Sequence, residues 1–257
     1  MTYRLPDNLW ARMQPLLPPR PPHPLGCHNP RTPDRKAMDA ILFVLRTGCQ
    51  WNALTATGIC TSSSARRRFQ AWTQAGVFEA FWREGLLVYD DLVGIDWAWL
   101  SLDGAMGKAP LGGGKKTGPN PPDRGKGGVK RSVLADGRGV PISLVIAGAN
   151  VNDHLLMRET LDSVPVARPR PTKRTPQHLC LDKGYDAAAP RTLAEERGFT
   201  LHLRRRGEEV QAKRHRSAKA RRWVVERAHA WLNRFRGVLI RWPKKPQNYR
   251  ALVHFAC

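Results

Sequence analysis

Apolar residues in the first ninety positions recur every three or four residues, which is the spacing of one face of an α-helix. Pro33 suits the first turn of a helix and Gly48 suits its end. The pattern predicts helices over about 9–17, 33–48, 62–72 and 77–89. We therefore expect residues 1–94 to form an all-helical domain.

The helices expected at 33–48 and 62–72 are candidates for the DNA-binding element. A helix, a short connection and a second helix resemble a helix-turn-helix, whose second helix enters the major groove. The second helix here opens with Arg66, Arg67 and Arg68, which would then contact phosphates or base edges. A small helical bundle with a solvated basic face explains the same residues equally well, so both interpretations stay open.

From residue 95 the pattern changes to short apolar runs separated by turn residues, which predicts strands. The turn sequence at 136–139 predicts a hairpin. We expect strands over 95–102, 129–135, 140–146, 178–181 and 199–203, and helices near 154–161, 187–197 and 219–236. This order is a ribonuclease-H-like layout. It predicts an α/β (α+β) catalytic domain over 95–257, with a mixed five-stranded sheet and mobile basic loops near 104–128, 165–177 and 204–222.

Composition narrows the class of protein. The 257 residues carry a formal net charge of +22, which indicates a polyanionic partner, most often nucleic acid; a basic ribosomal-type or membrane-surface protein is the alternative. No apolar run reaches about 18 residues and the start lacks an apolar signal core, so we expect neither a membrane span nor secretion. Five cysteines without a CxxC pair argue against a disulfide framework or zinc ribbon and favour reduced cytosolic thiols.

Three acidic residues carry the candidate chemistry. Asp103 and Asp182 each end an apolar strand pattern and precede a break, and Glu226 lies in a later helical pattern. Carboxylates placed in this way can converge on Mg²⁺, and two such ions support phosphodiester chemistry. Glu226 lies about 200° around its helix from Val224, off the apolar stripe and on the face of His229. Turn-forming aspartates and a solvated glutamate are the alternatives.

Motifs along almost the whole chain resemble those of bacterial DDE transposases of the insertion sequence 5 group. In the first part these are LPDNLW (5–10), PLLP (15–18) and RTGCQW (46–51). In the second part they are SLDG (101–104), GGVKR (127–131), GANVND (148–153), DKGYD (182–186) and VERAHAWLNRFR (225–236). Their combination and order make the resemblance specific.

The resemblance implies a function. Asp103, Asp182 and Glu226 would be the metal-binding catalytic triad, holding two Mg²⁺ ions with Mn²⁺ as a substitute. The enzyme would cleave the terminal inverted repeats of its element in double-stranded DNA, and the freed 3′-hydroxyl would attack target DNA with no covalent protein intermediate. A homodimer or higher oligomer would hold the two ends. The expected location is the bacterial cytoplasm, at the nucleoid and away from membranes.

The last catalytic helix departs from the pattern of the wider group. Lys219 stands where the group often has tyrosine, and Asn233 stands where it often has lysine, which leaves Arg234 as the candidate for that contact. Further candidates for contacts with DNA phosphates are Lys130, Arg131, Lys183 and Arg222. We interpret His154 and His229 as ordinary helix residues rather than catalytic groups.

Two other functions remain open at this point. The first is a catalytically inactive DNA-binding protein derived from a transposase. The second is another ribonuclease-H-type metal-dependent nuclease, acting on RNA or on DNA junctions. Binding without strand breakage would favour the first, and cutting of RNA–DNA hybrids regardless of sequence would favour the second.

Overall fold

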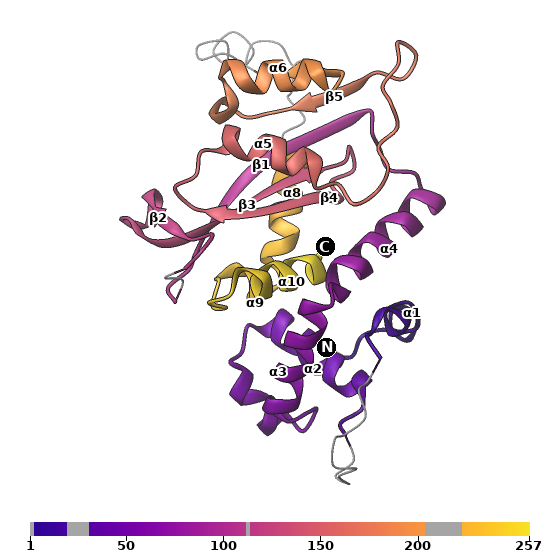
Figure 1. The fold of residues 1–257 in the computed structure, drawn as a ribbon, viewed down its shortest axis with the longest axis vertical. Helices are drawn as coiled ribbons and strands as arrows, with labels where there is room; N and C mark the ends of the chain where they lie inside the picture. Colours follow the sequence, from indigo (N-terminus) through magenta and orange to yellow (C-terminus); the bar gives the residue numbers. More distant parts are fainter. Residues whose placement is uncertain (1–2, 20–30, 112–113, 204–222) are drawn as a thin grey trace.

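The first part of the chain is helical, as its periodicity predicts. The computed structural model describes residues 3–19, 31–111, 114–203 and 223–257. Its first helices are α1 (Asp7–Met13), α2 (Asp34–Thr47), α3 (Ser62–Gln74) and α4 (Val77–Leu92), with short 3₁₀ helices at Gln14–Leu16 and Trp51–Thr57 (Figure 1). Gly48 ends α2 with a φ of 67°, a left-handed conformation that glycine adopts without strain.

The connection between α2 and α3 differs from that of a compact helix-turn-helix. It contains the 3₁₀ helix Trp51–Thr57, whereas a helix-turn-helix joins its helices by a turn of about three or four residues. Arg68 of α3 forms an ion pair with Asp34 of α2, with 3.1 Å between Nε and Oδ1, so one of the three arginines fastens the two helices together. The bundle interpretation fits this geometry better, and DNA reading by α3 stays a prediction.

A mixed sheet forms the second part of the chain. Its strands are β1 (Trp99–Lys108), β2 (Gly118–Asn120), β3 (Lys126–Ala135), β4 (Pro141–Gly148), β5 (Gln177–Cys180) and β6 (Phe199–His202). β3 pairs antiparallel with β1, β2 and β4, whereas β5 lies parallel to β1 and to β6. The expected hairpin and the ribonuclease-H-like arrangement are confirmed, with six strands where five are expected.

The first strand begins and ends later than the sequence pattern indicates. The sequence pattern predicts a strand over 95–102, but β1 begins at Trp99, continues through Asp103 to Lys108 and pairs with β3 along that length. The expected loop at 104–128 is therefore wrong at its start, and it also contains β2. The glycines hide the strand pattern: a Cβ on Gly104 would lie 2.0 Å from Oδ1 of Asp153, so a larger residue there would displace the Asp153 carboxylate.

Helices cover both faces of the sheet. They are α5 (Asp153–Asp162), α6 (Ala188–Glu196), α8 (Trp223–Asn233), α9 (Arg236–Leu239) and α10 (Pro246–Ala256) (Figure 1). Neighbouring residues on a strand point to opposite faces. On β3, Lys130 reaches Asp153 of α5 and Arg131 reaches Asn233 of α8, so these two helices lie on opposite faces. The expected loop at 204–222, with the first residues of the last expected helix, lies outside the described residues.

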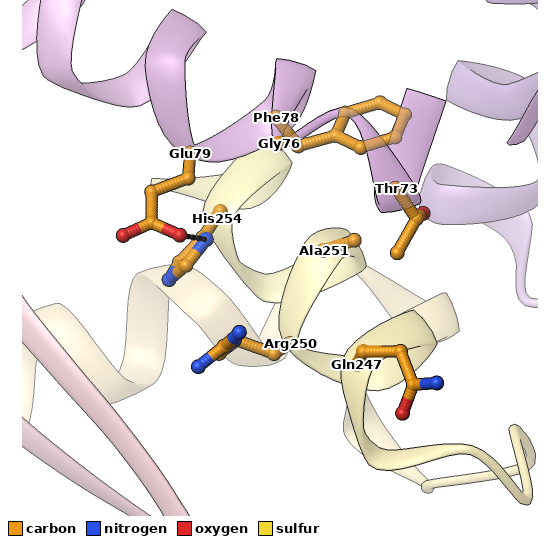
Figure 2. A pocket seen from close by; sticks show the side chains of 8 residues that line it. All are labelled: Thr73, Gly76, Phe78, Glu79, Gln247, Arg250, Ala251 and His254. Carbon is orange, nitrogen blue, oxygen red and sulfur yellow. Dashed lines mark ion pairs between the residues drawn. The ribbon is translucent and has the colours of Figure 1, made fainter. Parts of the chain in front are cut away.

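The C-terminal helices join the sheet to the N-terminal helices. A Cβ on Gly237 of α9 would lie 2.8 Å from the Val44 carbonyl of α2, and the rings of Phe78 and Phe255 lie 5.3 Å apart. A small pocket remains between α10 and the α3–α4 region, where Glu79 faces His254 at 4.0 Å (Figure 2). One buried apolar core runs through both parts of the chain. The domain limits at 94 and 95 stay a prediction.

None of the helices in the described ranges combines the length and the apolar composition that a membrane crossing needs.

Candidate functional site

Asp103 and Asp182 occupy equivalent positions on two neighbouring parallel strands. In the register of β1 and β5, Ser101 lies opposite Cys180, and each aspartate follows two residues later. Asp182 comes just after its strand, as expected, and caps the 3₁₀ helix Lys183–Tyr185 by accepting a 2.5 Å hydrogen bond from the Lys183 amide. Asp103, by contrast, lies inside its strand. Both carboxylates are half-buried.

Tyr185 is a buried tyrosine whose pKa responds to the charges of the nearby carboxylates. Burial raises the pKa of Tyr185, and the negative charges of Asp153, Asp103 and Asp182 raise it further, while the Ser132 hydroxyl lowers it. A charge affects a pKa in this way only when it lies close by. All three carboxylates therefore lie near this buried hydroxyl, but they do not share one face of the sheet: the register of β1 and β3 places Asp103 on the α8 side with Arg131, whereas Asp153 lies on the α5 side with Lys130.

Sequence reasoning did not select Asp153. Its carboxylate forms an ion pair with the Lys130 ammonium, with 3.0 Å between Oδ1 and Nζ, and that ammonium also donates a 2.7 Å hydrogen bond to the Val151 carbonyl. Gly104 and Gly184 both lie beside this carboxylate. The signal was present in the motif GANVND, whose last residue begins α5. Asp153 links β1, β3 and the segment after β5.

Glu226 lies at the edge of the face with which α8 contacts the sheet. The buried residues of α8 are Val224, Val225, Ala228, His229 and Leu232, whereas Trp231 is 48% exposed. The buried face therefore includes His229, which the sequence pattern places with Glu226 off the apolar stripe. Glu226 is exposed and precedes His229 by about one helical turn.

His229 lies directly against β1. Burial lowers its pKa to about 4, and the nearby charge of Arg131 lowers it as well, whereas the backbone carbonyl of Asp103 acts in the opposite direction. The imidazole is therefore neutral near pH 7. Because it lies next to the Asp103 backbone, α8 passes beside the acidic strand. Within the described residues, however, no three acidic, histidine or cysteine side chains form a ready metal-binding group. Glu226 as the third ligand stays a prediction.

The predicted DNA-contacting residues fall into different environments. Lys130 and Arg131 are buried: Lys130 pairs with Asp153, and Arg131 donates a 2.6 Å hydrogen bond to Oδ1 of Asn233. These internal partners do not favour direct phosphate contact. The physical reason is that both β3 residues lie under helices, α5 on one face and α8 on the other.

The remaining candidates are more accessible. Arg66, Arg67 and Arg234 are exposed, and Lys183 is half-buried. The Arg234 guanidinium carbon lies 5.9 Å from the centre of the Trp231 ring. Arg222 lies outside the described residues. DNA contact by any of these residues stays a prediction.

Comparisons with known proteins cover both parts of the chain. A family model described as a putative transposase of the IS4/5 family matches residues 5–82, and one described as a transposase DDE domain matches residues 100–257. A putative transposase for insertion sequence element IS402 from Burkholderia cepacia is 36% identical over 149 residues, which are 56% of this chain and 68% of that protein.

Two further similarities are more limited. An uncharacterised 16.2 kDa protein of the same insertion element is 38% identical over 120 residues, covering 45% of this chain and 80% of that protein. The crystal structure of the catalytic domain of Mos1 mariner transposase is 12% identical, covers 60% of this chain and 86% of that one, and has a TM-score of 0.30. A likeness this distant carries no functional argument.

Proposed function

The chain belongs to the family of transposases that contain a DDE domain, and on this premise we propose that it cleaves the ends of an insertion sequence and joins them to target DNA. The supporting observation is the parallel register of β1 and β5, which places Asp103 and Asp182 at equivalent positions on neighbouring strands. Glu226, on the helix that passes beside Asp103, is the proposed third member of the catalytic set.

The proposed residues have the chemistry that divalent cations require. Carboxylate oxygens are the hard ligands that Mg²⁺ and Mn²⁺ prefer, and Asp103 and Asp182 concentrate negative charge in a half-buried place. Cations bound there would supply Lewis-acid polarisation of the phosphodiester and of the attacking oxygen. In this proposal Asp103, Asp182 and Glu226 hold the ions, and neutral His229 adds no positive charge next to Asp103.

The proposed partner is double-stranded DNA, as the terminal inverted repeats and the target. Support comes from the net charge of +22 and from exposed Arg66 and Arg67 on α3. Because transposition brings two element ends together, we include in the proposal a homodimer or a larger symmetric assembly on DNA.

The experiment incubates the protein with Mg²⁺ and DNA that carries the inverted repeats flanking its gene. We expect end cleavage and joining to a second DNA. Asp182→Asn should abolish cleavage while duplex affinity stays within about twofold, because the substitution removes a metal ligand rather than a phosphate contact.

The matched control is Asp186→Asn, four residues away. Asp186 forms an ion pair with Arg191 at 2.7 Å and lies outside the proposed triad, so cleavage should persist. Wild-type binding without strand breakage would favour an inactive DNA-binding protein. Cutting of RNA–DNA hybrids regardless of sequence would favour a different nuclease, and loss of affinity in Asp182→Asn would make Asp182 structural.

A further inference from the structure

Arg241 is a fully buried arginine held by backbone carbonyls. Its side chain is 0% exposed, and its guanidinium lies 5.9 Å from the centre of the Tyr249 ring. Its hydrogen bonds go to the carbonyl oxygens of Lys116 at 2.6 Å, Lys244 at 3.1 Å, Pro243 at 3.2 Å and Lys115 at 3.3 Å. In the part of the chain that the structure describes, no carboxylate forms an ion pair with it. A planar guanidinium with five donors is suited to several carbonyls at once.

These bonds join segments that are far apart in the sequence. The Arg241 side chain ties the segment before β2 to the segment before α10, and its backbone amide donates a 2.8 Å hydrogen bond to the Lys108 carbonyl at the end of β1. One buried residue, through its side chain and its backbone amide, therefore fixes the relative position of three segments.

The fixed segments present a group of lysines to solvent. Arg241 binds the carbonyls of these segments, and four exposed lysines project from them: Lys115, Lys116, Lys244 and Lys245, which we name the Arg241 cluster. Trp242, which follows Arg241 in the sequence, is 48% exposed. Lys116 faces Glu159 at 3.4 Å, an exposed ion pair of the kind that contributes little. The result is a basic surface with an accessible aromatic ring.

The Arg241 cluster adjoins the strand that carries Asp103. From Asp103 to Lys108 is five residues, or about 17 Å of strand at about 3.4 Å per residue. B-form DNA advances about 3.4 Å per base pair, so this is about five base pairs. A duplex with one phosphodiester at Asp103 therefore has further phosphates within reach of the cluster.

We propose that the Arg241 cluster is a second contact surface for duplex DNA, which binds backbone phosphates a few base pairs from the cleaved bond. Arg241 is a positioning residue, because it touches no DNA and sets where the lysines stand. The identification of DNA as the ligand rests on the proposed function. An anionic lipid surface is the competing partner for such lysines, and the adjacent catalytic strand favours DNA.

The test compares two triple variants of the full chain. Lys115→Gln, Lys244→Gln and Lys245→Gln together remove three charges from the cluster, and Arg170→Gln, Lys173→Gln and Arg174→Gln remove three exposed charges from the segment before β5. The dissociation constant for a fluorescent 30-base-pair duplex is measured by anisotropy over a series of salt concentrations. Each lost phosphate contact should lower the salt slope by about 0.9, so the cluster variant should lose about 2.7 and bind roughly tenfold to hundredfold more weakly.

The possible results separate this inference from the proposed function. If the wild type shows no salt-dependent binding to DNA, both fail. If the wild type binds and cleaves DNA but the cluster variant matches the control variant in affinity and slope, only the inference fails. It also fails if the cluster variant loses binding to vesicles of phosphatidylserine while keeping its affinity for DNA.

A second variant tests the role of Arg241. Arg241→Met removes a charge that has no exposed surface, so any fall in the salt slope reports displaced lysines. We expect the slope of Arg241→Met to approach that of the cluster variant at a temperature where its far-UV circular dichroism is native. A native spectrum with an unchanged slope would overturn the positioning role. If Arg241→Met does not fold, the cluster variant alone decides.

Discussion

The surroundings of Tyr185 and of Arg241 are built on opposite plans. Near Tyr185, strand register sets the positions of Asp103 and Asp182, whose charges act on a buried neutral phenol. Around Arg241, a buried cation gathers carbonyls from loops, and its own hydrogen bonds set the positions of the surrounding lysines. The positions of Asp103 and Asp182, which we call the acidic centre, therefore depend on the hydrogen bonding of the sheet. The positions of the lysines of the Arg241 cluster depend on one side chain.

The largest expected effect separates chemistry from binding. Asp103→Asn should lower the rate of DNA cleavage by about a thousandfold or more, because it removes a proposed metal ligand, and it should leave the salt dependence of binding unchanged. Single-turnover cleavage and anisotropy on the same duplex measure the two quantities. Equal losses of cleavage and affinity would contradict the division between the two regions.

The next effect concerns the support of the acidic centre. Lys130→Met leaves the half-buried Asp153 carboxylate without its ammonium partner, which we expect to lower the free energy of unfolding by about 2–3 kcal/mol. Urea unfolding measures the loss. Lys126→Met, at an exposed position on the same strand, is the control and should change stability by less than about 0.5 kcal/mol. Adding Asp153→Asn to Lys130→Met should restore part of the loss; no recovery would mean that the ion pair is not the cause.

Acid should lower the stability of the protein through His254, a buried histidine on α10. Burial, with a smaller contribution from the charge of Arg250, lowers the pKa of His254 on α10 to about 3. The unfolded chain has the higher pKa, near 6.5, so the stabilising contribution is complete above pH 6.5 and is lost as the pH falls toward 3. The slope should be about 1.4 kcal/mol per pH unit within this window.

His254→Phe tests this pH dependence. It keeps an aromatic ring beside Trp82, whose ring lies 5.0 Å from that of His254. Thermal unfolding between pH 7 and pH 4 should show a shallower dependence in the variant than in the wild type. Equal slopes would assign the acid sensitivity to other groups.

The smallest expected effect lies at the rim of the basic surface. Lys116 and Glu159 form an exposed ion pair, so Glu159→Gln should change the free energy of unfolding by less than about 0.5 kcal/mol. Duplex affinity should rise slightly, because the Lys116 ammonium loses a competing carboxylate. Titration at low salt measures the change, and weaker binding would contradict the assignment of Lys116 to the Arg241 cluster.

The family and most of the fold could be predicted from the sequence. The motif resemblance is confirmed by family models over 5–82 and 100–257. Helical periodicity placed α2 and α4 within a few residues, because their apolar faces pack against the core. β1 could not be placed correctly, since Gly104 and Gly107 carry no side chain that shows whether a strand continues.

The site was less accessible to sequence reasoning. The sequence predicts that Asp103 and Asp182 lie near each other, and the parallel register of β1 and β5 gives them equivalent positions on neighbouring strands. The sequence predicts phosphate contacts for Lys130 and Arg131, because charge alone does not reveal the ion pair of Lys130 with Asp153 or the hydrogen bond of Arg131 to Asn233. Arg241 was missed entirely, because its partners are backbone carbonyls, and no side-chain pattern predicts those.

The Tyr185 phenol gives the acidic centre an internal reporter. Because burial and carboxylate charge both make its proton harder to remove, Tyr185 will stay un-ionised at an alkaline pH that titrates exposed tyrosines. A cation held by Asp103 and Asp182, as proposed above, would offset part of their charge and should therefore lower the pKa of Tyr185. Alkaline titration of the tyrosine absorbance with and without Mg²⁺ would follow this ring without any added label.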